Sequence, residues 1–252
     1  MSFNVTAEAY ARFMGRFSAP LADEFVALVD PRPGRRALDV GCGPGALTAL
    51  LVERLGPAAV CAIDPSEPFV AAARARFPDT EVQHGVAENL PFAADSFDLS
   101  LAQLVVHFMA DPVAALREMS RVTRPGGVVA ASVWDYGGDR SPLSAFWRAA
   151  AELDPSVTGE SHLAGAREGQ LVEQFTAAGL DDVQQSVLTI RVGFATFDEW
   201  WDPFTLGVGP AGVHLAGLDP PRRAELEQRC AALLPSAPFV LESSAWVATG
   251  RA

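Results

Sequence analysis

The stretch of sequence that most constrains the fold is ALDVGCGPGALT, residues 37 to 48. An apolar run is followed by three glycines at every second position, Gly41, Gly43 and Gly45. Because glycine has no Cβ, it adopts left-handed backbone conformations and lets the main chain come close to a ligand. A strand, a glycine-rich turn and a helix in this order are typical of the first unit of a ligand-binding α/β sheet. The sequence therefore predicts a ligand at this turn.

Short apolar runs alternate with helical patterns from residue 36 to residue 134, which is the signature of successive βαβ units and a parallel sheet. Two more apolar runs follow near the end of the chain. The fold class we expect is α/β, a Rossmann-like, doubly wound and mostly parallel seven-stranded sheet. The expected strands are 36–40, 58–63, 80–84, 97–106, 128–134, 183–192 and 239–252.

The length of 252 residues suits a single domain. Open α/β sheets bind ligands at their carboxyl edge, where we expect helical elaborations. We divide the domain (1–252) into an N-terminal helical lid (1–35), a cofactor-binding core (36–134) and two substrate-side elaborations (135–166 and 193–220). Within the second elaboration, GVGPAGVHLAG (207–217) is expected to be a flexible loop.

The charge and composition of the chain restrict the classes of partner that it can bind. The net charge of −12 argues against a nucleic acid, because an acidic chain repels phosphate backbones. Apolar runs long enough to span a membrane are missing, and the N-terminus has no pattern of a secretory signal. The three cysteines are too scattered for a disulfide framework or a zinc site, so we expect a cytoplasmic protein without a metal. The oligomeric state stays open.

The glycine turn allows two ligands. Gly41, Gly43 and Ala46 satisfy the dinucleotide pattern G-x-G-x-x-G/A, and Asp64 lies 64 − 41 = 23 positions after Gly41, which fits a nicotinamide cofactor. Asp39, however, would repel a pyrophosphate about 6 Å away by roughly 3 kcal/mol. Pro44 also removes one N–H that would bind phosphate. S-adenosylmethionine carries an ammonium and a sulfonium but no phosphate, so neither objection applies to it.

The segment LDVGCGPG resembles the first motif of class I S-adenosylmethionine-dependent methyltransferases, in the methyltransferase type 11, ubiquinone-biosynthesis-like branch. The likeness covers about half of the chain and keeps the order and spacing of the family. It continues through AIDPS (62–66), GVAENLPF (85–92), the segment 96–127 and VVAASVW (128–134). The flanking segments 7–22 and 197–204 resemble that branch as well.

This resemblance implies S-adenosyl-L-methionine as cofactor, S-adenosyl-L-homocysteine as product, and in-line methyl transfer to an oxygen, nitrogen or carbon atom of a small organic acceptor. Asp39 and the glycine turn would face the methionine part, and Asp64 would bind both ribose hydroxyls. At Val86 the family usually has an acid that binds the adenine amino group, so here main chain, water or Glu88 must replace it. The implied cofactor residues are Tyr10, Asp39, Gly41, Cys42, Gly43, Gly45, Asp64, Pro65, Ala87, Glu88, Gln103 and Leu104.

Catalysis and acceptor binding are less determined. His107, just past the fourth strand, is the best-placed candidate for a general base because its ordinary pKa lies near neutral pH, although a structural histidine explains it as well. Large aromatic side chains either line an acceptor pocket or form the core of the cap. Likewise, residues 10–17 either cover the cofactor or pack on the sheet. The candidate acceptor residues are Phe13, Phe17, Trp134, Tyr136, Trp147 and Trp201.

Two alternatives remain at this stage. The glycine spacing with Asp64 also suits a nicotinamide-dependent oxidoreductase. The same fold also serves proteins that bind S-adenosylmethionine or a partner without catalysis, because a fold does not fix a function.

Overall fold

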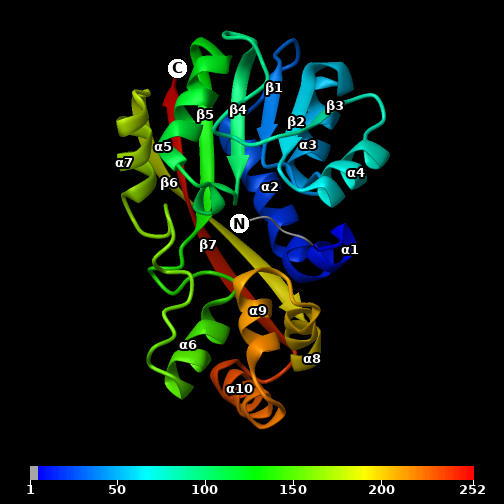
Figure 1. Cartoon of the computed structure of the whole chain (residues 1–252), viewed down its shortest axis with the longest axis vertical. Coiled ribbons are helices and arrows are strands. Elements are labelled where there is room, and N and C mark those ends of the chain that lie inside the picture. Colours follow the sequence, from blue (N-terminus) through cyan, green and yellow to red (C-terminus); the bar gives the residue numbers. More distant parts are fainter. Residues whose placement is uncertain (1–4) are drawn as a thin grey trace.

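A seven-stranded sheet forms the centre of the computed structural model, which describes residues 5–252 (Figure 1). The strand order is β3-β2-β1-β4-β5-β7-β6, parallel except for β7, which is antiparallel to both of its neighbours. This confirms the mostly parallel, doubly wound sheet. The strands are β1 Ala37–Val40, β2 Val60–Asp64, β3 Glu81–His84, β4 Phe97–Gln103, β5 Thr123–Trp134, β6 Asp181–Phe194 and β7 Phe239–Arg251.

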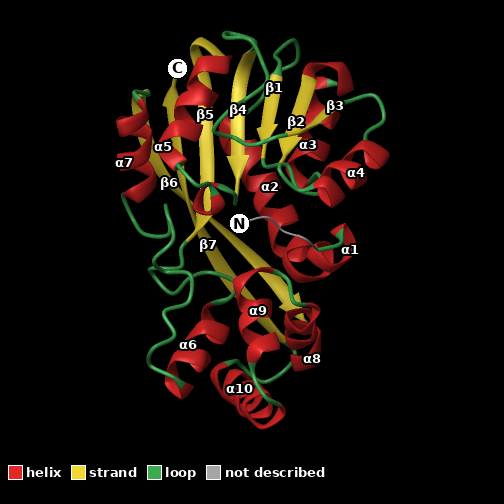
Figure 2. Ribbon diagram, viewed as in Figure 1, coloured by secondary structure: helices red, strands yellow, loops and turns green. Residues whose placement is uncertain are grey.

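Helices cover both faces of the sheet, as Figure 2 shows. The helices are α1 Ala7–Tyr10, α2 Arg16–Val29, α3 Ala46–Leu55, α4 Glu67–Arg76, α5 Pro112–Val122, α6 Ser144–Leu153, α7 Gln170–Ala178, α8 Phe197–Trp201, α9 Gly209–Gly217 and α10 Pro220–Leu233. Side chains of α2 and α3 pack on Ala37 and Leu101, whereas those of α5 and α7 pack on Leu38 and Ala102. Neighbouring strand residues thus face opposite helix layers, so the central strands β1 and β4 are buried on both faces.

The turns follow the sequence signals closely. Asp111 caps α5 by accepting from Ala114 N, Thr196 caps α8 by accepting from Glu199 N, and Gly179 ends α7 with a φ of 87°. The fourth strand is shorter than expected because Leu104 has a φ of 58°, which turns the chain out of the sheet.

The N-terminal segment packs on the sheet and also reaches its carboxyl edge. A short π-helical turn, Ala11–Gly15, joins α1 to α2. Phe25 of α2 is fully buried against the sheet, whereas Tyr10 and Phe13 reach the carboxyl edge and line cavities there. The segment is therefore anchored by α2 and presents its first turns to the ligand edge.

Strands β6 and β7 form a long antiparallel ribbon. They pair from Asp181–Arg251 to Phe194–Phe239, whereas β5 accompanies β7 only over Ala245–Arg251. The ribbon therefore extends past the parallel strands toward α8 and α9 (Figure 1). We call α6, α8, α9 and α10 with their connections the cap.

The prediction of a flexible loop at 207–217 is wrong, because residues Gly209–Gly217 form the helix α9. Ala211 and Leu215 of this helix are buried in the same cluster as Phe146 of α6. Tertiary packing therefore stabilises a helix that its glycine content disfavours. Within residues 5–252, no helix has the length and apolar character needed to cross a membrane.

Candidate active site

A cavity of about 520 Å³ opens at the carboxyl ends of β1, β2 and β4, and we call it the cofactor cavity. A small cavity beside it, lined by Asp39 and Cys42, shares five lining residues with it. Eleven of the twelve expected cofactor residues line one or both of these cavities, and Gly45 lines neither. Those that line the cofactor cavity are Tyr10, Gly41, Gly43, Asp64, Pro65, Ala87, Glu88, Gln103 and Leu104.

The glycine turn folds back toward β2. The amides of Gly41 and Cys42 both donate to Ile63 O, at 2.8 and 3.1 Å. Gly41 has a φ of +72°, and a Cβ on it would lie 2.4 Å from Val105 Cγ2. Position 45 requires glycine for a different reason, because a Cβ there would lie 2.4 Å from the ring of Phe77. Gly45 is therefore placed against α4 rather than in the cavity.

Asp64, the last residue of β2, joins two loops at the cavity wall. Its Oδ2 accepts from Gly43 N at 2.8 Å and its Oδ1 from Ser66 N at 2.8 Å. The side chain is nearly buried, with 6% exposed, and burial raises its pKa while these two hydrogen bonds oppose the rise. A carboxylate with two oxygens at a cavity wall suits a vicinal diol, because each oxygen accepts a further hydrogen bond.

Asp39 is an acid buried beside the turn. It is 1% exposed, and Thr48 Oγ1 donates to its Oδ2 at 2.6 Å. Burial raises the pKa of Asp39 to about 7, the charge of Asp64 adds to the rise, and Thr48 opposes it. In the part of the chain that the structure describes, Asp39 forms no ion pair.

Gln103 adds an unsatisfied acceptor to the same small cavity. Its Nε2 donates to Ser18 O at 2.8 Å, but its buried Oε1 has no hydrogen-bond partner among residues 5–252. A buried acid and an orphaned amide oxygen match a ligand that donates hydrogen bonds and carries positive charge. The ammonium end of S-adenosylmethionine, which donates hydrogen bonds, fits these acceptors, whereas a phosphate does not.

The side chain of Glu88 binds main-chain amides of a neighbouring loop. Glu88 Oε1 accepts from Ala110 N at 2.8 Å and from Asp111 N at 3.3 Å, so this oxygen fixes the loop that precedes α5. Val86 lines the cofactor cavity with 47% of its surface exposed. The same cavity is also lined by Ser66 and Phe69, which the sequence did not indicate as cofactor residues.

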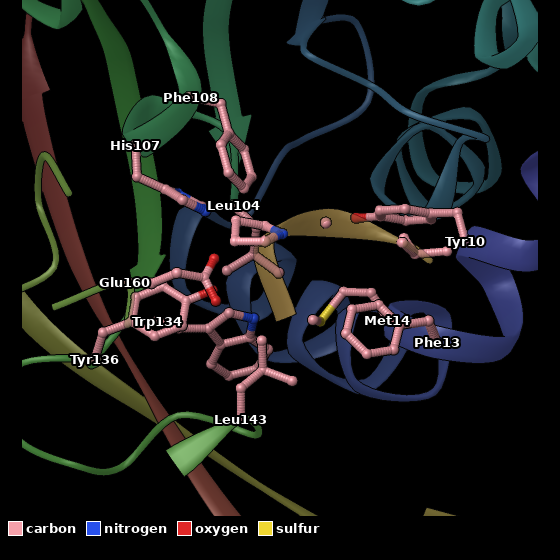
Figure 3. Close-up of a pocket in the computed structure, with 13 residues that line it drawn as sticks. Tyr10, Phe13, Met14, Leu104, His107, Phe108, Trp134, Tyr136, Leu143 and Glu160 are labelled. Carbon is pink, nitrogen blue, oxygen red and sulfur yellow. The ribbon is translucent and has the colours of Figure 1, made fainter. Parts of the chain in front are cut away.

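A third cavity, of about 30 Å³, lies under the cap, and we call it the acceptor cavity (Figure 3). Tyr10, Leu104 and Phe108 line both this cavity and the cofactor cavity, so the two adjoin. Four of the expected residues line it: Phe13, His107, Trp134 and Tyr136. It is also lined by residues that were not expected there: Met14, Phe108, Leu143, Glu160, Val208, Gly209 and Pro210.

The other expected acceptor residues lie elsewhere. Phe17 packs against Phe194 with ring centroids 6.0 Å apart, and Trp201 stacks on Phe197 at 6.0 Å, so both belong to the core of the cap and its base. Trp147 lies behind the cavity wall, where its Nε1 donates to Glu160 Oε2 at 2.8 Å.

His107 lies on the wall of the acceptor cavity, in the short helical turn Val106–Phe108 after β4. Its ring is 6% exposed, and burial lowers its pKa to about 3. The ring is therefore neutral at neutral pH. The expectation that His107 is a general base rested on an ordinary pKa, and burial removes that support.

Glu160 is the residue that sequence reasoning missed. It lies in the irregular connection between α6 and α7, with 3% exposed, and it is hydrogen-bonded to Trp147 and Tyr136. Burial raises its pKa to about 7 against the effect of these hydrogen bonds. The surrounding segment has no motif or periodicity that would mark a buried acid.

The strand order, with an antiparallel β7 between β5 and β6, and the acid-bearing glycine turn match the Rossmann-like sheet that the resemblance to S-adenosylmethionine-dependent methyltransferases implies. Comparison with known families agrees, because a model described as a methyltransferase domain matches residues 38–131. The chain is also 31% identical over 198 residues to a malonyl-[acyl-carrier protein] O-methyltransferase of Erwinia billingiae, covering 75% of this chain and 76% of that protein. The chain thus belongs to the S-adenosylmethionine-dependent methyltransferase family.

Solved structures show the same fold. The YcgJ protein from Bacillus subtilis matches with a TM-score of 0.59 and 20% identity over 91% of this chain and 97% of that one. A geranyl diphosphate methyltransferase in complex with S-adenosylmethionine matches with a TM-score of 0.56 and 14% identity, over 94% and 87%. The match spans between 33% and 62% of the length of seven further curated relatives.

Proposed function

We propose that this protein transfers a methyl group from S-adenosylmethionine to a small organic acceptor. The observation that carries the proposal is the pair of Asp39 and the Gln103 Oε1, a buried acid and an orphaned acceptor beside the glycine turn. The family membership decides against the nicotinamide alternative. The acceptors named for the relatives, a malonyl-[acyl-carrier protein] and geranyl diphosphate, differ from each other and do not identify the acceptor here.

In this proposal the walls of the cofactor cavity and of the small cavity beside it have distinct roles. Asp39 and Gln103 bind the ammonium end, and Asp64 binds the ribose hydroxyls. Ala87 and Glu88 border the adenine, and Pro65 lies beside the Asp64 carboxylate. When bound, S-adenosylmethionine supplies a methyl group already activated on a sulfonium.

Residues shared by the two cavities set where donor and acceptor meet. Tyr10, Leu104 and Phe108 line both, so their side chains enclose the junction and exclude water from it. Alignment at such a junction supplies roughly 7–11 kcal/mol in favourable cases, because the reacting groups no longer need to find each other. We infer that residues 7–15 act as the lid over this junction.

The proposed setting is a reducing cytoplasm, supported by the free, buried state of Cys42, Cys61 and Cys230. The net charge of −12 supports a small-molecule acceptor over a nucleic acid. We keep the domain limits expected from the sequence as part of the proposal, with the cofactor-binding core at 36–134 and the substrate-side segments at 135–166 and 193–220.

Isothermal titration with S-adenosylhomocysteine tests the cofactor assignment. Saturable binding supports it, and no heat at millimolar ligand contradicts it. Thermal-shift measurements with S-adenosylhomocysteine and with NAD distinguish the two cofactors, because a ligand that binds the folded state raises its melting temperature. Transfer of a labelled methyl group to a component of a producing-cell extract would distinguish an enzyme from a binding protein.

A further inference from the structure

The acceptor cavity combines an apolar wall with three buried polar groups (Figure 3). Trp134 is fully buried, and its Nε1 has no hydrogen-bond partner in the described part of the chain. The same holds for Nδ1 of His107. The third group is the carboxyl of Glu160, and the lining includes no arginine. Figure 3 shows the indole nitrogen of Trp134 on the side that faces the Glu160 carboxylate.

These groups restrict the chemistry of the atom that reaches them. The indole N–H of Trp134 can only donate a hydrogen bond, and the ionised carboxylate of Glu160 can only accept one. A hydroxyl satisfies both at once, because its oxygen accepts and its hydrogen donates. An ammonium group would leave Trp134 unsatisfied, and a carboxylate would face Glu160 with like charge.

We propose that the acceptor is an apolar molecule with a hydroxyl group, that this hydroxyl enters the cavity of about 30 Å³ between Trp134 and Glu160 once the lid of residues 7–15 moves to admit the rest of the molecule, and that Glu160 receives its proton. The inference rests on the proposed methyl transfer and names its substrate class. The methyl–sulfur bond breaks with its electron pair left on sulfur, and a methyl–oxygen bond forms. The hydroxyl proton passes to the Glu160 carboxylate, so an alcohol or phenol becomes a methyl ether.

The surroundings of Glu160 suit this role. Its neighbours with titratable side chains are Tyr136, His107 and Tyr10, and burial raises the pKa of both tyrosines and lowers that of the histidine. All three are neutral at neutral pH. Glu160, with a pKa of about 7, is the group of this cavity that gains and loses a proton there. Trp147 and Tyr136 hold its carboxyl in place by hydrogen bonds.

A route for the proton leads away from the acceptor. Glu160 and Tyr136 also line a fourth cavity, of about 150 Å³, on the far side of the wall. The lining of this cavity is mostly polar and consists otherwise of Asp139, Ser141, Ser144, Trp147, Thr158 and Ser161. Asp139 is half exposed and paired with Arg148, so the cavity reaches the surface. Glu160 can therefore release its proton to water without reopening the apolar side.

The test uses three probes of similar shape: para-cresol, para-toluate and para-methylbenzylammonium. Binding to the protein saturated with S-adenosylhomocysteine is measured by calorimetry. We expect para-cresol to bind at least ten-fold more tightly than either charged probe, and Trp134→Phe and Glu160→Gln each to reduce this preference at least five-fold. Equal or tighter binding of para-toluate, or no binding of para-cresol, overturns the proposal.

The proton transfer is tested by kinetics with para-cresol. Glu160→Gln, which keeps an oxygen for Trp147, should lower kcat about 100-fold, as the loss of a general base does. The kcat of the unchanged protein should rise with pH through about 7, and that of the variant should not. Glu168→Gln removes an exposed acid of the same connection and should leave kcat unchanged.

The outcomes distinguish a failure of the proposed methyl transfer from a failure of the role of Glu160. Failure of S-adenosylhomocysteine to bind overturns the proposed function itself. Normal binding of S-adenosylhomocysteine by Glu160→Gln with an unchanged kcat overturns the role of Glu160 alone. Binding of para-cresol without any methyl transfer overturns that role as well.

Discussion

Asp39→Asn should stabilise the protein and at the same time weaken cofactor binding. The substitution removes a buried charge, and the asparagine oxygen can still accept from Thr48 Oγ1, so the local contacts are preserved. The two effects have opposite signs because the charge is costly in the empty cavity and favourable beside a cationic ligand.

The size of the stability effect follows from the pKa of Asp39. Burial raises it from 3.8 to about 7, so the folded state binds more protons than the unfolded state between these values. Stability is therefore lost as pH rises from about 4 to about 7 and is constant above. The asparagine variant mimics the protonated acid, so its gain should be about 2 kcal/mol at pH 5 and about 4 kcal/mol at pH 8, as upper limits.

Urea denaturation of both proteins at pH 5 and pH 8 measures this gain. Asp79→Asn, at an exposed acid, serves as a control in which we expect no change. Calorimetry should show S-adenosylhomocysteine binding weakened by about 1–3 kcal/mol, the value of a charge-assisted hydrogen bond. An Asp39→Asn protein that is less stable at pH 8, or that binds S-adenosylhomocysteine as well as before, would refute the reasoning.

Three further substitutions test the cofactor cavity. Asp64→Ala should weaken S-adenosylhomocysteine binding by about 1.5–3 kcal/mol in calorimetry, and an unchanged affinity would contradict its ribose role. Gly41→Ala should lower stability by about 1–3 kcal/mol in urea denaturation, since its Cβ would overlap Val105; Val105→Ala in the same chain should restore part of the loss. Val86→Asp should tighten the same ligand by about 0.5–1.5 kcal/mol if it accepts from the adenine amino group; weaker binding would place the adenine elsewhere.

The cofactor half of the molecule could be predicted from the sequence because its signals are local. Strand β1, the glycine turn and α3 are contiguous, and Asp39 and Asp64 each end or nearly end a strand whose direction the apolar pattern defines. Parallel strands end at one edge, so residues far apart in sequence meet there. Gly45 shows the limit, since its need for glycine arises from Phe77, a contact that no local pattern reveals.

The acceptor half could not be predicted because its contacts are long-range. Glu160 stands in an irregular connection and becomes significant only through Tyr136 and Trp147. Phe17 and Trp201 have the same aromatic character as Phe13 and Trp134, and only packing decides which of them face a cavity. The α9 helix has weak intrinsic propensity, and the buried cluster around Phe146 determines its conformation.

The ribbon of β6 and β7 has a consequence for how such a protein can change during evolution. Beyond β5, its two strands satisfy each other's backbone hydrogen bonds, so this arm needs no support from the parallel strands. Helices carried at its far end can be exchanged for others, because the glycine turn is held by its own contacts with β2. A hybrid with α8 to α10 taken from a relative should therefore keep its affinity for the methyl donor, and its acceptor cavity should change only where Val208, Gly209 and Pro210 line it.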